Sequence, residues 1–80
     1  MTKQQTVPVS ERAAILRINR RLRADDQVLK TTRGARARLD LGDFYVLDFR
    51  NNLALQTNVD LESFGRELGA LAEYEHVVEA

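Results

Sequence analysis

Few side chains in this sequence could carry out catalysis. The chain has one histidine, His76, and two serines, Ser10 and Ser63, and it contains no cysteine. A general base needs a nucleophile within hydrogen-bond reach and a third group that orients it. The sequence predicts that Ser10 caps a helix and that Ser63 lies on a helix surface, so neither is placed to serve His76. We therefore expect an exposed His76 without a catalytic role, and a protein that is not an enzyme.

Metal and cofactor chemistry is equally poorly supplied. One histidine and no cysteine leave carboxylates as the main metal ligands, and Asp40, Asp43 and Asp48 lack the spacing of a calcium loop. The four glycines fit neither a phosphate-binding loop nor a dinucleotide-binding fingerprint. A chain of 80 residues also has little material for a pocket that buries a substrate. We expect no catalytic residue, no metal, no cofactor and no small-molecule substrate.

Arginine is the binding side chain in good supply, and it is concentrated in the first half of the chain. Residues 1–38 hold ten Lys and Arg against three acidic residues, a net +7, while residues 39–80 carry a net −7. Guanidinium groups bind phosphate and carboxylate oxygens in a bidentate manner. The predicted basic binding surface consists of Arg17, Arg20, Arg21, Arg23, Arg33, Arg36 and Arg38. We predict that basic and acidic groups segregate in space; the alternative is that folding interleaves them as solvated neighbours.

The C-terminal residues form a second predicted binding segment, which is acidic with apolar members. These members are Leu71, Glu73, Tyr74, Glu75, Val77 and Val78. One prediction is that a partner surface orders this segment. The alternative is that it packs on its own domain and extends a core that so short a chain barely completes. Residues 1–80 are predicted to form one domain, with residues 1–8 as a flexible arm and residues 72–80 as an acidic tail.

The first helix that would position these groups begins after Ser10. Serine is a preferred N-cap residue, and Ile15, Ile18 and Leu22 follow at helical spacing, which predicts one apolar stripe and a helix to about Arg23. The arginines of this segment spread over the remaining circumference of the helix.

The last helix is predicted to begin after Asp60 and to close at Gly69. Its apolar stripe consists of Leu61, Phe64 and Leu68. Gly65 lies on the same side, and an interior glycine there predicts a close approach of the helix to a sheet.

Three segments between the helices are predicted to be strands: 28–32, 44–49 and 53–59. We expect a three-residue loop at 50–52, which would pair Leu47 with Leu55 and would place Asn52 in the left-handed conformation. Residues 35–41 alternate like a strand but have the composition of a helix, so both alternatives stay open. The predicted fold is α+β: an N-terminal helix, an antiparallel sheet of three or four strands and a C-terminal helix, with both helices packed on the sheet.

Two stretches of the sequence resemble small uncharacterised bacterial proteins, some of them from mobile elements. The stretches are Leu41–Asp48 (LGDFYVLD) and Val59–Gly69 (VDLESFGRELG). The shared residues are turn, cap and core positions. The resemblance implies an accessory protein of a phage, plasmid or integrated element that binds host machinery.

Together these observations predict a non-enzymatic protein-interaction module, an adaptor or accessory protein whose partner is another protein or a second copy of itself. The alternative is a protein that contacts the phosphates of duplex nucleic acid through its N-terminal arginines. All aromatic residues lie outside the basic half, which disfavours base stacking on single strands. No apolar run approaches the roughly 20 residues of a membrane helix, so we expect a cytoplasmic protein without a membrane partner.

Overall fold

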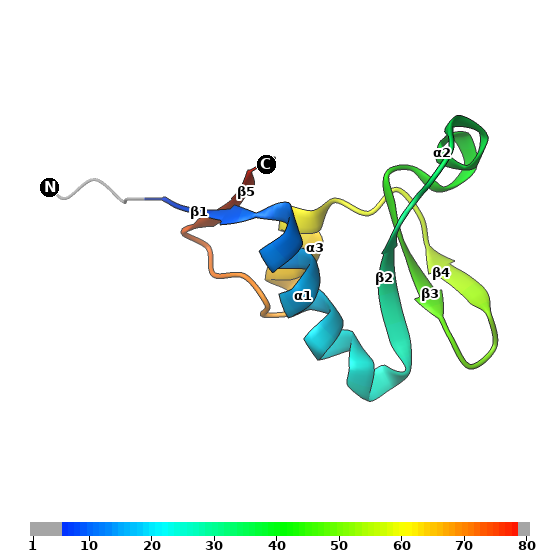
Figure 1. The fold of residues 1–80 in the computed structure, drawn as a ribbon. Helices are drawn as coiled ribbons and strands as arrows, with labels where there is room; N and C mark the ends of the chain where they lie inside the picture. The colour runs from blue at the N-terminus through cyan, green and yellow to red at the C-terminus, as the bar shows by residue number, and fades with distance from the viewer. Residues whose placement is uncertain (1–5, 79–80) are drawn as a thin grey trace, which may run out of the picture.

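A computed structural model describes residues 6–78 of the chain, and Figure 1 shows the arrangement of its helices and strands. In chain order they are β1 (Val7–Ser10), α1 (Glu11–Leu22), a 3₁₀ turn η1 (Arg23–Asp25), β2 (Gln27–Thr31), α2 (Ala35–Leu41), β3 (Phe44–Asp48), β4 (Leu53–Gln56), α3 (Leu61–Glu67) and β5 (Glu75–Val78). The protein is α+β, as the sequence predicts. No helix in this part of the chain combines the length and the apolar character needed to cross a membrane.

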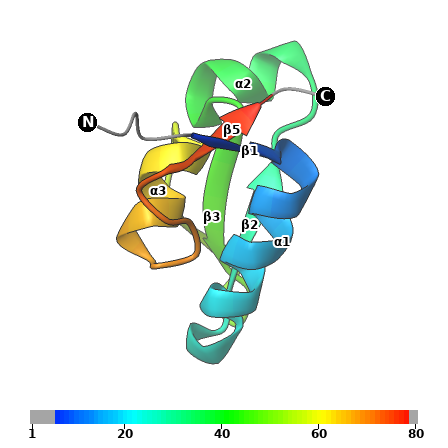
Figure 2. The same cartoon turned by 90° about the vertical axis from the view of Figure 1, so that its left-hand side faces the viewer.

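The strands form two separate sheets. The antiparallel sheet has the order β2-β3-β4, and β1 and β5 form a parallel pair. Helices α1 and α3 lie on one face of the antiparallel sheet, and α2 projects beyond one end of it (Figure 1). The β1-β5 pair packs on α1 and α3, in front of both helices in Figure 2. Among residues 6–78, no helix lies over the opposite face of the antiparallel sheet (Figure 1).

The predicted layout with terminal helices is wrong at both ends. A strand precedes α1, and a strand follows α3, because β1 and β5 pair with each other. Val7 and Pro8, predicted to belong to a flexible arm, are the first residues of β1. The rest of the predicted arm includes residues 1–5, which lie outside the described residues. The valines of both segments suit strands, and the pairing gives the chain a second small core.

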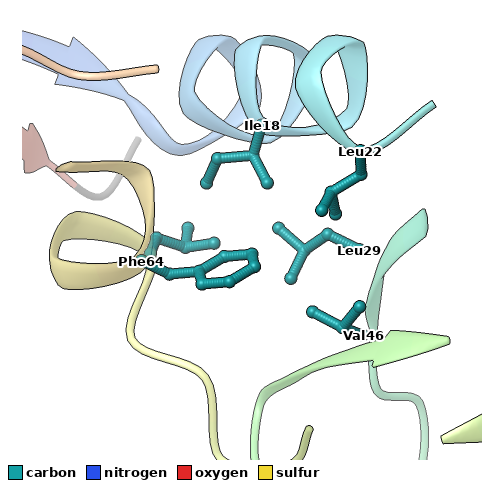
Figure 3. Packing of buried hydrophobic residues seen from close by; sticks show 6 residues of the cluster. Ile18, Leu22, Leu29, Val46 and Phe64 are labelled. Carbon is teal, nitrogen blue, oxygen red and sulfur yellow. The ribbon is translucent and has the colours of Figure 1, made fainter. Parts of the chain in front are cut away.

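The main core lies between α1, α3 and the antiparallel sheet (Figure 3). It consists of Ile18, Leu22, Leu29, Val46, Leu61 and Phe64, of which Ile18 and Val46 are fully buried. A second cluster joins Val9 of β1, Ala14 of α1 and Leu71, which follows α3. The predicted apolar stripes of α1 and α3 supply most of the main core, so this part of the prediction is confirmed.

Both predicted N-caps are present. The Ser10 hydroxyl accepts a hydrogen bond from Ala13 N at 3.1 Å, and the Asp60 carboxylate accepts one from Ser63 N at 3.0 Å. These bonds satisfy backbone donors that an α-helix leaves unpaired in its first turn. The backbone hydrogen bond from Ser63 also lowers the pKa of Asp60 below its ordinary value.

Residues 35–41 form a helix, which decides between the two alternatives left open by the sequence. Gly34 precedes α2 with a φ of 89°, and Gly42 follows it with a φ of 76°, so the helix is bounded by two conformations that glycine adopts readily. No α2 residue is fully buried, and Leu39 is 87% exposed.

The β3-β4 hairpin differs from the prediction. The turn spans residues 49–52, so that Asp48 pairs with Leu53 and Leu47 with Ala54, rather than Leu47 with Leu55. The Asp48 carboxylate accepts hydrogen bonds from the backbone N–H groups of residues 50 and 51 and fixes this wider turn. A register shift between Val46 and Leu47 then places a bulge in the ladder. The predicted left-handed conformation of Asn52 is present, with a φ of 53°.

Gly65 permits a close approach, but not the one predicted. A Cβ atom at this position would lie 2.6 Å from Cδ1 of Leu71, so the neighbour is the segment after α3 and not the sheet. The second core therefore depends on this glycine, because Leu71 reaches Val9 and Ala14 over its bare Cα.

Candidate interaction surface

The predicted arginine surface divides into two groups. The first group lies on α1 and the turn that follows it, and part of it is used within the domain. Arg17 Nη1 is 2.8 Å from Glu75 Oε2, and Arg21 Nη2 donates a 3.2 Å hydrogen bond to the carbonyl oxygen of Gly69. These two arginines join α1 to β5 and to the end of α3. Arg20 and Arg23 are exposed.

The second group lies on and before α2, at the other end of β2. Arg33, Arg36 and Arg38 are all exposed, and Arg38 Nε is 3.6 Å from Asp43 Oδ1. Within residues 6–78, Arg33 and Arg36 make no side-chain hydrogen bond or ion pair. The segment 27–31 separates the two groups as strand β2, with η1 at one end and α2 at the other (Figure 1). The seven arginines therefore do not lie together on one surface.

Three of the four ion pairs among the described residues join the basic half of the chain to the acidic half, and the fourth, Arg66–Glu62, lies within α3. In Arg17–Glu75 and Arg38–Asp43, the arginine belongs to the first half and the carboxylate to the second. In the third pair, Arg50 of the second half lies 3.3 Å from Asp26 of the first half. This pairing matches the alternative stated for the sequence, in which folding interleaves opposite charges. The exposed pairs Arg38–Asp43 and Arg50–Asp26 contribute about 0–1 kcal/mol each, whereas the Glu75 side chain is only 13% exposed.

The predicted acidic tail is not a free segment over most of its length. Leu71 is 4% exposed within the second core, and residues 75–78 form β5. Leu71, Glu75, Val77 and Val78 therefore pack on their own domain, as in the alternative stated for the sequence, while an interaction through this segment stays a prediction. Glu73 and Tyr74 are exposed, and Tyr74 lies in the connection before β5.

Glu75 is held from two directions. One carboxylate oxygen accepts a hydrogen bond from Ala72 N at 2.9 Å, and the other lies 2.8 Å from Arg17 Nη1. The backbone hydrogen bond from Ala72, followed by the bond from Arg17, lowers the pKa of Glu75 below its ordinary value of 4.5. The ionised Glu75 carboxylate therefore links β5 to α1 through its ion pair with Arg17.

The groove and the unpaired polar groups of the described residues lie beside side chains that have structural roles. His76 is half-buried in β5, not exposed as predicted, and its Nδ1 has no hydrogen-bond partner among residues 6–78. An open groove of about 510 Å³ lies beside Asp43, Asp60 and Glu62. Asp60 caps α3, and Glu62 binds Arg66 and the backbone N–H of residue 77, so both carboxylates have structural roles. Within the described residues, no three potential metal ligands are grouped at a possible metal site.

The free edge of β2 is closed by a side chain of α1. The Asn19 carboxamide oxygen accepts a hydrogen bond from Leu29 N at 2.6 Å, and its nitrogen donates one to Leu29 O at 3.3 Å. An unpaired strand edge presents backbone groups that can pair with another chain, and covering such groups prevents this. Asn19 therefore occupies the outward backbone groups of Leu29, the central residue of β2.

The edges of the parallel pair are protected as well. On β5, the Glu62 carboxylate accepts a 2.9 Å hydrogen bond from Val77 N, and Arg66 Nη2 donates a 2.8 Å bond to Glu75 O. Both of these side chains come from α3. On β1, Pro8 lacks a backbone N–H group, and proline is one of the residues that discourage edge pairing.

The free edge of β4 has none of these protections. All four residues of β4 are exposed, with Leu53 at 58% and Leu55 at 44%. Within residues 6–78, the only backbone hydrogen bonds of β4 are those of its ladder with β3. No residue from Asn51 to Val59 carries a charge, although charged side chains are the commonest protection of an edge.

The uncovered face of the antiparallel sheet adjoins this edge. Val28, Leu47 and Ala54 lie opposite one another across β2, β3 and β4, so they form one row on the same face. This row alternates with the buried Leu29 and Val46, which face the helices, so it points away from them. We define the β4 side of the molecule as the β4 edge together with this row.

Sequence reasoning missed the β4 side because it searched for charges and catalytic groups. The available signal was the uncharged stretch from Asn51 to Val59, which contains a strand with two leucines. The comparisons with known proteins do not add to this description: no family model, no curated protein and no solved structure matches the chain.

Proposed function

We propose that the protein is a non-enzymatic interaction module that associates with a second copy of itself through the β4 side. The observation that carries the proposal is the contrast between edges. Side chains of α1 and α3 bind backbone groups of β2 and β5, and β1 contains Pro8, whereas β4 has no proline, no charged residue and no such contact among the described residues.

Exposed apolar side chains on the β4 side supply a driving force for association. Leu53 and Leu55 of β4 are 58% and 44% exposed, and Phe49, in the turn that adjoins the β4 side, is 52% exposed. Removing such side chains from water contributes roughly 25 cal/mol per Å² of apolar surface. Burying these side chains in a complex would therefore contribute favourable free energy that the monomer does not gain.

Charge favours a second copy over a strongly charged partner. The formal net charge of the chain is 0, so two copies do not repel each other at long range. The contact region itself is uncharged between Asn51 and Val59, so this stretch offers no ion pair to a charged partner. A second copy presents the same neutral and apolar surface.

The proposal is tested by the mass of the purified protein in solution. Sedimentation velocity over a range from micromolar to millimolar protein should show a species of twice 9.1 kDa that grows with concentration. The salt dependence should be small, because the contact is apolar. A monomer at every concentration would refute self-association.

A second candidate function, contact with duplex nucleic acid, is favoured by one observation. Arg33 and Arg36 are exposed beside and on a projecting helix, and they have no partner among the described residues. A mobility-shift titration on random duplex DNA should then lose affinity steeply with added salt. The double variant Arg33→Glu/Arg36→Glu should abolish binding, while Arg20→Glu on α1 serves as the matched control. The cytoplasmic location and the mobile-element origin stay predictions.

A further inference from the structure

We infer that two copies pair edge to edge, β4 beside β4, as antiparallel strands of one six-stranded sheet. This inference rests on the proposed function and specifies its mode. The strand order would be β2-β3-β4-β4-β3-β2, and all helices would lie on the same face. The alternative mode, in which two sheets stack through the row of Val28, Leu47 and Ala54, is an outcome of the test.

The backbone of β4 supplies the hydrogen bonds for this pairing. β4 is flanked by β3 on one side only, so its outward N–H and C=O groups face solvent. Main-chain pairing at an exposed edge is a general mode of recognition, in which backbone bonds give affinity and side chains give specificity. On β2, by contrast, the Asn19 carboxamide binds the outward N–H and C=O of Leu29, so these groups are not available to a second chain.

The side chains of β4 are compatible with a symmetric pairing. A two-fold axis at the centre of β4 would place Leu53 opposite Gln56, and Ala54 opposite Leu55, in each direction. Every such pair is neutral, whereas like charges directly opposite each other destabilise a ladder. The other edge of this sheet, β2, carries the exposed Lys30, and a charged side chain on an edge strand discourages pairing with another chain.

The bulge limits the extent of the pairing. It places an irregularity in β4 opposite Val46 and Leu47, and bulges bend the strand that contains them. We therefore expect a short paired segment and a dimer that dissociates on dilution. The measurements must therefore include high concentrations of the full chain, at which a weak dimer is populated.

The test compares lysine substitutions on the edge with lysine substitutions elsewhere. Leu53→Lys/Leu55→Lys places four like charges at the pairing edge and should leave only monomer over the whole concentration range. Leu39→Lys, at an α2 position that is 87% exposed, and Leu16→Lys, at an α1 position that is 61% exposed, are matched controls and should dimerise like the wild type. Circular dichroism checks that each variant keeps its helices.

A second variant separates edge pairing from face stacking. Val28→Lys adds charge to the uncovered face on the strand farthest from β4, so edge pairing predicts that the dimer survives. A dimer that is lost in Val28→Lys but kept in Leu53→Lys/Leu55→Lys would overturn the edge mode while self-association stands. A wild-type protein that stays monomeric would overturn both.

Hydrogen exchange gives a readout that does not depend on a variant. In the wild type, the amides of residues 53–56 should exchange more slowly at high protein concentration than at low concentration, while the amides of α2 should not change. Equal exchange of residues 53–56 at both concentrations, when sedimentation shows a dimer, would overturn the pairing through β4.

Discussion

The contact between Asn19 and Leu29 predicts a large loss of stability for a change at one helical position. Asn19→Ala removes the acceptor for Leu29 N and the donor to Leu29 O, which lie at 2.6 Å and 3.3 Å. Leu29 is only 3% exposed, so its backbone groups gain little access to water. Leaving buried polar groups without a partner costs about 1–3 kcal/mol. The expected decrease in the free energy of unfolding is in this range.

The change can be measured by urea unfolding followed by circular dichroism. For a domain of this size, each kcal/mol corresponds to roughly 4–8 °C in the melting temperature, so thermal unfolding should resolve the effect as well. Alanine is the better helix former, so propensity alone predicts a stabilisation of several tenths of a kcal/mol for the same substitution. The two causes therefore predict opposite signs.

Arg20→Ala is the matched control, because Arg20 is the next residue of α1, is exposed and forms no hydrogen bond with the described residues. It should change stability by less than about 0.5 kcal/mol. If Asn19→Ala is as stable as this control, the reasoning that Asn19 closes the edge of β2 is refuted. If Asn19→Ala is destabilised and also associates more strongly, the opened β2 edge has become a pairing site.

Three further predictions concern the second core and the loop before β3. Gly42→Ala should lower the free energy of unfolding more than Gly65→Ala does, because its Cβ would lie 2.8 Å from the backbone Cα of Asn58 at a φ of +76°, whereas Gly65→Ala meets the flexible side chain of Leu71. Urea unfolding of both variants checks this order, and equal losses would contradict it. Gly65→Ala itself should cost about 1–2 kcal/mol, since overpacking outweighs the gain in helix propensity. Glu75 has a lowered pKa, so it stabilises the fold above pH 4.5 and this contribution is lost as the pH falls through the lower pKa of the folded state. Glu75→Gln should thus be less stable than the wild type at neutral pH, and the difference should shrink as the pH falls below 4.5; a constant difference would argue against the ionic role.

The parts of the fold that could be predicted are those with local causes. The caps at Ser10 and Asp60 and the apolar stripes of α1 and α3 follow from residues within one or two turns of a helix. The β1-β5 pair could not be predicted in the same way, because its two strands are more than sixty residues apart in the sequence and only their contact in space identifies them as partners. Its valines fit a strand, but nothing near them in sequence identifies the partner.

The distribution of charges along the sequence could not predict which strand edge is covered, that of β2, and which is exposed, that of β4. Summing charges by halves of the chain ignores that Arg17 and Glu75 meet in space. One useful signal was present in α1: Asn19 lies four residues after Ile15 and three before Leu22, on the apolar stripe. A polar side chain at such a position needs a partner, and the structure shows that this partner is the edge of β2.

The pairing of β1 with β5 has a consequence for the protein during its synthesis. Val9 and Ala14 emerge from the ribosome early, yet the residue that completes their cluster, Leu71, and the strand that pairs with β1 are translated more than fifty positions later. Until then the nascent chain exposes the apolar groups of its first strand and helix to chaperones and proteases. The segment from α1 to β4 needs none of these later residues for its antiparallel sheet or for the contact of α1 with β2.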